Sequence, residues 1–402
     1  MSNDRDLLTV EVGAVAHGGH CVARHDGRVI FVRHALPGET VRVKITERKT
    51  GYLRGDAVEI LTPAPGRREA PCPYAHPGGC GGCDFQHADP KTQLDLKTAV
   101  LREQLVRLGG MSVEEVEQYE VEALPGGEAG WRTRMQYAVD STGRAGLRGH
   151  RSHHVVPIDR CMVATPRIQE ADVLETDWSG FGSVGVVDSA APELSVHATR
   201  GRQEGHGRRA HAEQISGPAL IGENVGERRF ELMSEAFWQV HRHSARTFTQ
   251  TVIELLDPQP AESAWDLYGG AGLFAVALAE AVGEHGDVTL VETDRRGNAT
   301  GNLADLPQAR AVYGDVAALV DELPQPDVIV LDPPRSGAGE RVITGMVDAV
   351  PRAIAYVACD PAALGRDVKT FAKLGWGLRT LRSYDAFPMT HHFETIALFE
   401  RV

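Results

Sequence analysis

Residues 263–292 read SAWDLYGGAGLFAVALAEAVGEHGDVTLVE, and this stretch decides the fold of the C-terminal part of the chain. An apolar run reaches Asp266, a glycine-rich turn and an apolar helical pattern follow, and a second apolar run ends at Glu292. A strand, a helix and a strand in this order predict a βαβ unit with parallel strands. The glycines allow the backbone to pass close to a ligand at the start of the helix.

The same alternation continues on both sides of this stretch. We expect helices over 244–256 and 364–374 and further strands over 309–315, 326–332, 353–358 and 393–400. Such an alternation predicts a doubly wound, Rossmann-like α/β sheet whose ligands bind at the carboxyl ends of the strands. The polar residues that fall at those ends are Asp266, Glu292, Asp315, Asp332 and Cys359.

The turn after Asp266, in DLYGGAGLF, does not have the G-x-G-x-x-G spacing of dinucleotide sites. S-adenosylmethionine brings no phosphate and needs close backbone approach and acidic partners. Glu292 suits a ribose diol, because one carboxylate accepts two hydrogen bonds. These residues favour S-adenosylmethionine over a nicotinamide cofactor, and a purely structural glycine turn is the remaining alternative.

Two strand ends carry candidate catalytic groups, Asp332 in LDPPR and Cys359 in ACDP. A nucleophilic thiol must be exposed and held near a base, which a strand end braced by proline provides. The alternative for Cys359 is a buried structural cysteine. Arg335 stands where amino-group methyltransferases place an aromatic ring, which disfavours nitrogen as the target. Glu394 is either a base or a surface carboxylate.

The N-terminal part has a different character. Short β-rich runs over 7–61, separated by turns such as HGGH and LPGE, predict a small β-barrel. The stretch LTPAPGRREAPCP reads as a linker, which sets a boundary near residue 65. A helix is predicted over 94–108 from its leucine spacing. Residues 131–230 mix strands with loops, and RGRQEGHGRRAH at 200–211 is expected to form an exposed hairpin tip.

Composition bounds the class of protein. A chain of 402 residues favours two or three domains. It contains no run of about 18 apolar residues and its start is polar, so we expect a cytoplasmic protein without a membrane segment. The net charge is -13, yet residues 1–160 hold 21 Lys and Arg against 21 Asp and Glu. The N-terminal part therefore permits a nucleic-acid partner.

The cysteines are too few for a disulfide scaffold, so their spacing points to a metal or to catalysis. Four of them, Cys72, Cys80, Cys83 and Cys161, could hold either a zinc ion or a [4Fe-4S] cluster, and spacing does not separate the two. Four thiolates disfavour a radical S-adenosylmethionine site, which leaves one iron open. Cys21 has no such partners and is expected to pack inside the barrel.

Several motifs together resemble one family: VIFVRHALPGETV, CPYAHPGGCGGCDFQH, FWQVH, DLYGGAGLF, LDPPR, ACDP and HHFETIALF. The chain resembles the bacterial RNA (uracil-5)-methyltransferases that carry a TRAM barrel and an iron-sulfur cluster. This resemblance implies an OB-like TRAM barrel over 1–64, a central α+β iron-sulfur domain over 65–230, and a class I methyltransferase domain over 231–402. It also favours a [4Fe-4S] cluster over zinc at the four cysteines.

The resemblance further implies that Cys359 attacks C6 of uracil and that Glu394 removes the C5 proton. C5 is a poor nucleophile until a thiolate adds at C6, so the site must favour the thiolate. It implies contacts to S-adenosylmethionine from five residues: Gln239, Tyr268, Glu292, Asp332 and Asp315, the last near the adenine.

The sequence departs from the family pattern at two positions, His241 in place of Asn and Gly270 in place of Cys. The tripeptide Glu223-Asn224-Val225 also matches a motif of DNA cytosine-5 methyltransferases, and we interpret it as coincidence because it precedes the sheet. A catalytically inactive RNA-binding or assembly protein is therefore an alternative to the enzyme. An iron-sulfur redox protein would need a cofactor fingerprint that the sequence lacks.

The expected partner is a structured RNA. The TRAM barrel favours ribosomal RNA, and 23S rRNA in particular. Transfer RNA is the alternative substrate for the same chemistry. The basic barrel and the six arginines of residues 131–160 are expected to contact phosphates, with Arg42, Lys44, Arg132 and Arg134 among them. We expect a monomer.

Overall fold

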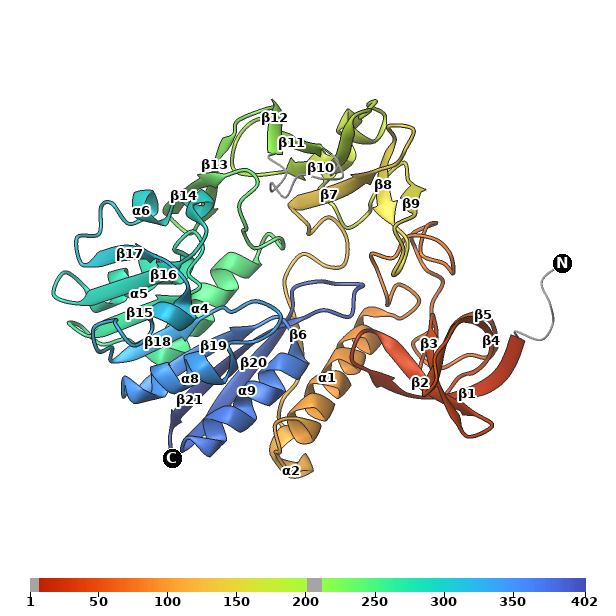
Figure 1. The fold of residues 1–402 in the computed structure, drawn as a ribbon. Coiled ribbons are helices and arrows are strands. Elements are labelled where there is room, and N and C mark those ends of the chain that lie inside the picture. Colours follow the sequence, from red (N-terminus) through yellow and green to blue (C-terminus); the bar gives the residue numbers. More distant parts are fainter. Residues whose placement is uncertain (1–6, 201–211) are drawn as a thin grey trace.

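The computed structural model describes residues 7–200 and 212–402. Figure 1 shows a barrel at one side of the molecule and a sheet covered by helices at the other, with a long helix between them. A second sheet lies above this helix. No helix in the described ranges is long and apolar enough to cross a membrane.

The N-terminal strands close into a barrel in the order β1-β2-β3-β5-β4. They are β1 (Leu7–Ala16), β2 (His20–His25), β3 (Arg28–Arg33), β4 (Thr40–Arg48) and β5 (Tyr52–Thr62). Period-two alternation sends Ile30, Val32, Val41 and Val43 inward, where they are fully buried. Cys21 is also buried, and its Sγ donates to the Ala35 carbonyl. The predicted barrel is confirmed, with β2 as a strand that the pattern of apolar runs did not pick out.

Helix α1 (Pro90–Arg107) begins with Asp89, whose side chain accepts a hydrogen bond from the Thr92 backbone, and with proline in its first turn. Its apolar face, including Leu101 and Leu105, is buried against the C-terminal region and packs on α9 (Pro361–Lys373). The short helix α2 (Val113–Val116) follows, and β6 (Val121–Ala123) then pairs in parallel with β20 (Trp376–Asp385). Segments from the range expected to form the central domain therefore complete the C-terminal sheet.

The central sheet has six strands in the order β12-β11-β10-β7-β8-β9. Its elements are β7 (Arg134–Val139), β8 (Ala145–Arg148), β9 (Val155–Pro157), α3 (Pro166–Gln169), η2 (Asp172–Leu174), β10 (Phe181–Val187), β11 (Ser195–Arg200) and β12 (Ala212–Ser216). A two-stranded hairpin follows, β13 (Leu220–Val225) and β14 (Arg228–Met233). The predicted hairpin tip at 201–211 lies outside the described residues.

The C-terminal sheet has eight strands in the order β17-β16-β15-β18-β19-β21-β20-β6. Its remaining strands are β15 (Ser263–Leu267), β16 (Asp287–Glu292), β17 (Ala309–Tyr313), β18 (Val328–Leu331), β19 (Ala353–Ala358) and β21 (Glu394–Arg401). The helical elements are α4 (Ser244–Leu256), α5 (Leu273–Val282), η3 (Arg295–Gly297), α6 (Ala299–Asn302), α7 (Val316–Leu319) and α8 (Gly339–Asp348). Strands β15 to β19 pair in parallel, as predicted, whereas β21 runs antiparallel between β19 and β20.

Candidate active site

The proposed ligand edge of the sheet follows from the parallel pairing. Strands β16, β15, β18 and β19 are consecutive neighbours and end at Glu292, Leu267, Leu331 and Ala358. Tyr268, Asp332 and Cys359 each come one residue after a strand end. They are therefore brought to the same edge, as the alternating sequence pattern predicts.

The antiparallel strand β21 adds Glu394 to this edge. Thr395 is the register partner of Ala358, so one step further along both chains places Glu394 beside Cys359. The Glu394 side chain is buried, with 6% of the residue exposed. This burial excludes the alternative of a surface carboxylate.

Burial raises the pKa of each group in this cluster, and neighbouring carboxylates add to the shift for Cys359 and Glu394. Burial, followed by the nearby Glu394 and Asp332 carboxylates, raises the pKa of the Cys359 thiol to about 12. Burial raises the pKa of Asp332 to about 7. Burial and then Asp332 raise the pKa of Glu394 well above its usual range, while Arg335 acts in the opposite direction. The cluster therefore holds protons readily, and Arg335 is the positive charge that favours its anionic forms.

His392 also belongs to this cluster. Its Nε2 lies 3.5 Å from Nη2 of Arg335. Burial, then His391 and Arg335, lower the pKa of His392 to about 3, so the ring is neutral near pH 7. His392 stands two residues before Glu394 in the sequence, but this position alone does not predict a role for His392.

Three of the predicted S-adenosylmethionine residues, Gln239, Tyr268 and Asp332, line one small cavity of about 30 Å³ beside the glycine turn. Glu292 holds this turn, because its carboxylate accepts from the Gly270 backbone at 2.9 Å and from the Asp294 backbone at 2.7 Å. Asp315 begins α7, where it accepts from the Ala318 backbone. Burial and then Asp315 raise the pKa of Tyr268 to about 12, which places Asp315 near the same edge.

The glycine turn has the features of a ligand cradle. A Cβ on Gly269 would lie 2.5 Å from the Leu290 side chain, so only glycine fits there. Gly270 has a φ of +56°. A Cβ added at Gly270 would meet no atom within 4 Å, so its backbone faces open space. Behind it, Asp266 is fully buried, and its Oδ1 has no hydrogen-bond partner in the described part of the chain. A buried acceptor without a partner beside an open backbone fits a polar ligand such as S-adenosylmethionine.

His241, one of the two departures from the family pattern, lies outside this cavity. It is buried and stacks on Trp131 with ring centroids 5.7 Å apart. Its Nδ1 accepts from the His243 backbone at 3.2 Å, and burial lowers its pKa to about 3. His241 therefore fills a packing position, so its identity does not alter the residues that line the cavity.

The four cysteines predicted as metal ligands, Cys72, Cys80, Cys83 and Cys161, line one shared cavity of about 210 Å³. Burial raises the pKa of Cys80 to about 11 and that of Cys83 to about 12, with Cys161 contributing to both. Within the described residues, no three Cys, His, Asp or Glu side chains are gathered closely enough to grip one metal ion. The cysteines thus surround a space and do not converge on a single point.

The segment that follows these cysteines contacts the loop that leads to Glu394. The backbone amides of Asp84 and Phe85 both donate to the Met389 carbonyl, at 3.0 and 2.8 Å. The Asp84 carboxylate lies 2.5 Å from Nδ1 of His391, and Gln93 of α1 accepts from the Met389 backbone at 2.7 Å. Sequence reasoning missed these contacts because they join residues that are far apart in the chain.

The barrel reaches the catalytic edge through His17, whose Nε2 lies 3.0 Å from Oδ2 of Asp360. Asp360 also caps α9 by accepting from the Ala363 backbone at 2.8 Å. The residue after the candidate nucleophile is therefore held by both the barrel and the helix. No local sequence signal marked His17.

Arg132 and Arg134 do not have the exposure that we expected of phosphate ligands. Arg134 is buried and pairs with Glu223 at 2.9 Å, and it also donates to the carbonyls of Ser234 and Ala236. Arg132 lines the cysteine cavity and donates to the Arg134 carbonyl. The ion pair of Arg134 with Glu223 speaks against its predicted phosphate contact, whereas the phosphate contact of Arg132 stays a prediction.

Comparison with known proteins gives consistent results along the whole chain. Residues 3–58 match the family described as TRAM domain, and residues 321–402 match tRNA (Uracil-5-)-methyltransferase. An uncharacterized RNA methyltransferase of Streptomyces avermitilis is 46% identical, over 97% of this chain and 97% of the relative. The 23S rRNA (uracil(1939)-C(5))-methyltransferase RlmD of Alkalilimnicola ehrlichii is 32% identical, over 99% of this chain and 97% of the relative.

Among solved structures, the chain is similar to the tRNA (uracil-54, C5)-methyltransferase of Pyrococcus abyssi in complex with S-adenosyl-L-homocysteine. The TM-score is 0.72 with 20% identity, over 98% of this chain and 100% of that chain. This likeness supports the fold of the whole described chain.

Proposed function

The chain belongs to the RNA uracil-5-methyltransferases, and from this premise we propose that it methylates C5 of a uridine in 23S rRNA through a covalent adduct of Cys359 with uracil C6. The observation that carries the adduct is the placement of Cys359 beside the buried Glu394 at the cradle edge. Ribosomal RNA is proposed over transfer RNA because a relative named for 23S rRNA is 32% identical over nearly the whole chain.

The first step forms a bond between Sγ of Cys359 and C6 of uracil, and the electron pair of the C5–C6 double bond moves toward the C4 carbonyl. Cys359 is a thiol in the free protein, since its pKa is raised to about 12, so its proton must pass to water before Sγ attacks C6. Arg335 lowers the pKa of both Cys359 and Glu394, so its charge favours the anions that attack and deprotonation require.

When bound, S-adenosylmethionine would supply the methyl group to C5 and leave as S-adenosylhomocysteine. Gln239, Tyr268, Glu292, Asp315 and Asp332 are the residues proposed to hold it. C5 then carries both the methyl group and its original hydrogen. Glu394 takes this proton, the C5–C6 double bond forms again, and the thiolate of Cys359 leaves C6. The raised pKa of Glu394 makes it a stronger base than an exposed carboxylate.

The decisive experiment uses Cys359→Ala and RNA that contains 5-fluorouridine. We expect the variant to lose methyl transfer while it still binds S-adenosylmethionine in calorimetry. The unaltered protein should form a stable adduct with the fluorinated RNA, because fluorine cannot leave as a proton. Appreciable turnover by Cys359→Ala would contradict the covalent mechanism. Absence of methyl transfer by the unaltered protein to any RNA would favour the inactive RNA-binding alternative.

The same family membership leads us to propose a [4Fe-4S] cluster at Cys72, Cys80, Cys83 and Cys161. Four thiols around a shared cavity of about 210 Å³ fit a cluster of several atoms better than one zinc ion. Four cysteine ligands leave no open iron, so its role is to hold the fold. Protein purified without oxygen should be brown and contain about four irons per chain. Colourless protein with one zinc would contradict the cluster.

We also propose three domains over 1–64, 65–230 and 231–402, with β6 of the second joining the sheet of the third and α1 packing on its helix α9. The chain is also proposed to act as a monomer in the cytoplasm. Light scattering of the purified protein and cell fractionation test these two points.

A further inference from the structure

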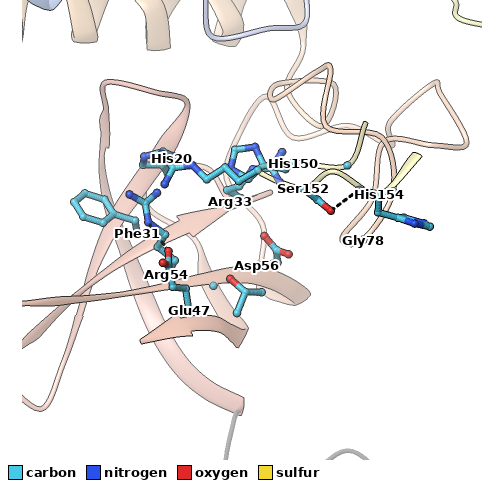
Figure 2. A pocket seen from close by; sticks show the side chains of 15 residues that line it. His20, Phe31, Arg33, Glu47, Arg54, Asp56, Gly78, His150, Ser152 and His154 are labelled. Carbon is cyan, nitrogen blue, oxygen red and sulfur yellow. Dashed lines mark hydrogen bonds and ion pairs between the residues drawn. The ribbon is translucent and has the colours of Figure 1, made fainter. Parts of the chain in front are cut away.

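A third cavity lies away from the catalytic edge, where three segments of the chain meet. Its volume is about 480 Å³. Strands β3, β4 and β5 of the barrel form one wall, Gly78 and Gly79 of the cysteine segment form another, and the loop between β8 and β9 closes the third side. Figure 2 shows Phe31, Arg33 and Arg54 on the barrel side, and His150 and Ser152 on the loop side.

The barrel wall combines aromatic rings with positive charge. Phe31 and Tyr52 meet edge to face with centroids 5.3 Å apart, and the Arg54 guanidinium lies 5.6 Å from Phe31 and 5.2 Å from Tyr52. Arg33 also faces the cavity with only 12% of its side chain exposed. Its Nη2 makes no hydrogen bond within the described residues, although it lies 3.6 Å from the Asp84 carboxylate. The half-buried Arg33 side chain therefore has one donor, Nη2, without a hydrogen-bond partner beside the cavity, which favours a polar ligand.

The loop wall adds a third cation. Arg151 is exposed at the tip of the loop and has a φ of +48°. Two acidic residues also line the cavity, but Glu47 already pairs with Lys49 at 2.8 Å and lies 3.2 Å from Arg54. Burial raises the pKa of the other, Asp56. With three arginines against two carboxylates in its lining, the cavity carries a net charge of +1 and suits an anionic ligand.

The two histidines nearest these arginines contribute rings without charge. Burial and then Arg54 lower the pKa of His20 to about 4, and burial and then Arg33 lower that of His150 to about 4. Near pH 7 each is a neutral ring with one donor and one acceptor. Flat rings, donors and cations in one cavity match an unstacked nucleotide, which presents a base and a phosphate. A simple anion would not need the rings.

A neighbouring cavity of about 440 Å³ shares Gly149, His150, Arg151 and Ser152 with the first. Arg148 and His153 line this neighbouring cavity. The loop between β8 and β9 therefore has hollows on two sides, and a chain ligand can continue from one into the other.

We propose that the cavity of Phe31, Arg33, Arg54 and Arg151 binds one unpaired nucleotide of the RNA substrate, separate from the uridine that is methylated. This inference rests on the proposed function only for the identity of the RNA as substrate. The base would lie against Phe31 and His150, and the phosphate would meet Arg33 and Arg151. The site would help to select RNA in which an unpaired nucleotide is available at the right place.

The test measures binding of a labelled single-stranded RNA of about 12 nucleotides to the full chain by fluorescence anisotropy at several salt concentrations. Phe31→Leu should weaken binding about fivefold or more, because it removes a stacking face while keeping an apolar side chain. Arg151→Gln should flatten the slope of log affinity against log salt by about 0.7. Arg151 is exposed, so this variant tests the site even if Phe31→Leu folds poorly. Arg24→Gln, an exposed arginine of β2 outside the cavity, is the matched control.

The proposal is overturned if both variants bind the RNA as the unaltered protein does, or if Arg24→Gln weakens binding as much. Adenosine monophosphate should also compete with the RNA at lower concentration than inorganic phosphate does, and equal competition would reduce the cavity to an anion site. A methyl-transfer assay separates this proposal from the proposed enzymatic function. If no RNA is methylated but binding still depends on Phe31 and Arg151, the nucleotide site stands and the proposed enzymatic function fails.

Discussion

At the scale of single residues, the catalytic edge brings together groups that prefer to be neutral. Asp332, Glu394 and Cys359 all have raised pKa values, and each carboxylate raises the pKa of the others or of the thiol. Such mutual shifts are typical of sites that move protons. Holding these groups in a buried cluster also lowers the stability of the folded protein. One prediction follows for proton transfer and one for stability.

Glu394→Gln keeps the shape of the side chain but cannot accept a proton. We expect this variant to accumulate the methylated covalent adduct on ordinary RNA, visible as a protein–RNA band on a denaturing gel. Glu400→Gln, on the same strand, should turn over normally. Loss of RNA binding without any trapped adduct would mean that Glu394 only positions other groups.

Asp332→Asn should stabilise the folded protein at pH 8 while abolishing activity. The pKa of Asp332 is raised from 3.8 to about 7, so between these values the folded state holds a proton that the unfolded chain releases. Its free energy of unfolding therefore falls as pH rises through this window, by at most about 4 kcal/mol. Thermal unfolding should show a higher Tm for the variant at pH 8 and no difference near pH 4. The exposed Asp348→Asn is the control, and an equal gain there would contradict the prediction.

The residue types of the site were predictable because strand ends gather at one edge of a parallel sheet. Cys359, Asp332 and Tyr268 lie where that rule places them. His17 and Asp84 were not predictable, since each acts on a partner that only the three-dimensional fold brings near. Arg134 shows the reverse error, because a charge count cannot tell an exposed arginine from one that is paired inside the protein.

At the scale of elements, helix α1 holds the loop that enters β21. Lys97 is fully buried on this helix, and its Nζ donates to Asp385 at 2.5 Å and to the Phe387 carbonyl at 3.1 Å. Gln93, one turn earlier, bonds to the Met389 backbone. The position of Glu394 therefore depends on a helix that lies far from it in the sequence.

Lys97→Met should lower the free energy of unfolding by about 3–5 kcal/mol, because it leaves Asp385 buried without its charge partner. Lys97→Met combined with Asp385→Asn should recover part of this loss, since the buried charge is removed as well. Lys91→Met, at an exposed position of the same helix, should cost little, because solvent screens its ion pair with Asp95. Urea unfolding measures all three, and similar losses at Lys91 and Lys97 would contradict the prediction.

Most elements of the C-terminal sheet were predictable from their hydrophobic periodicity, with β16 and α4 matching their predicted ranges. Strand β6 was not, because three residues carry no period. Strand β20 was also missed, since Arg379 and Arg382 interrupt its apolar pattern. Both arginines reach outward to acidic partners, Glu400 and Glu122, so the strand is stabilised by pairing that no local window contains.

At the scale of the whole molecule, the question is how an acidic protein holds a polyanion. The basic residues are concentrated in the N-terminal part, and Lys44 is exposed on the barrel. Arg42 beside it pairs with Glu59 at the surface, so part of its charge is matched. We expect the barrel to supply phosphate contacts and the far side of the C-terminal sheet to supply few.

Lys44→Gln should therefore weaken RNA binding and flatten its salt dependence by somewhat under one unit. Lys369→Gln and Lys373→Gln, at exposed positions of α9, should leave both quantities unchanged. Binding of S-adenosylmethionine should be the same in all three. Equal effects on the two faces would indicate that net charge alone, and not the barrel surface, governs binding.

The pairing of β6 with β20 also sets an order of events when the chain is made. The ribosome releases α1 and β6 early, but β20 begins only at Trp376 and the β21 strand that joins it to the sheet follows later still. Until α9 has emerged, the apolar face of α1 lacks the C-terminal helix that it packs against in the finished protein, although α2, β1 and β6 are already available. The C-terminal sheet can therefore close only after nearly all of its residues have emerged. A nascent chain paused in the central region exposes part of the apolar face of α1, so we expect it to bind a chaperone.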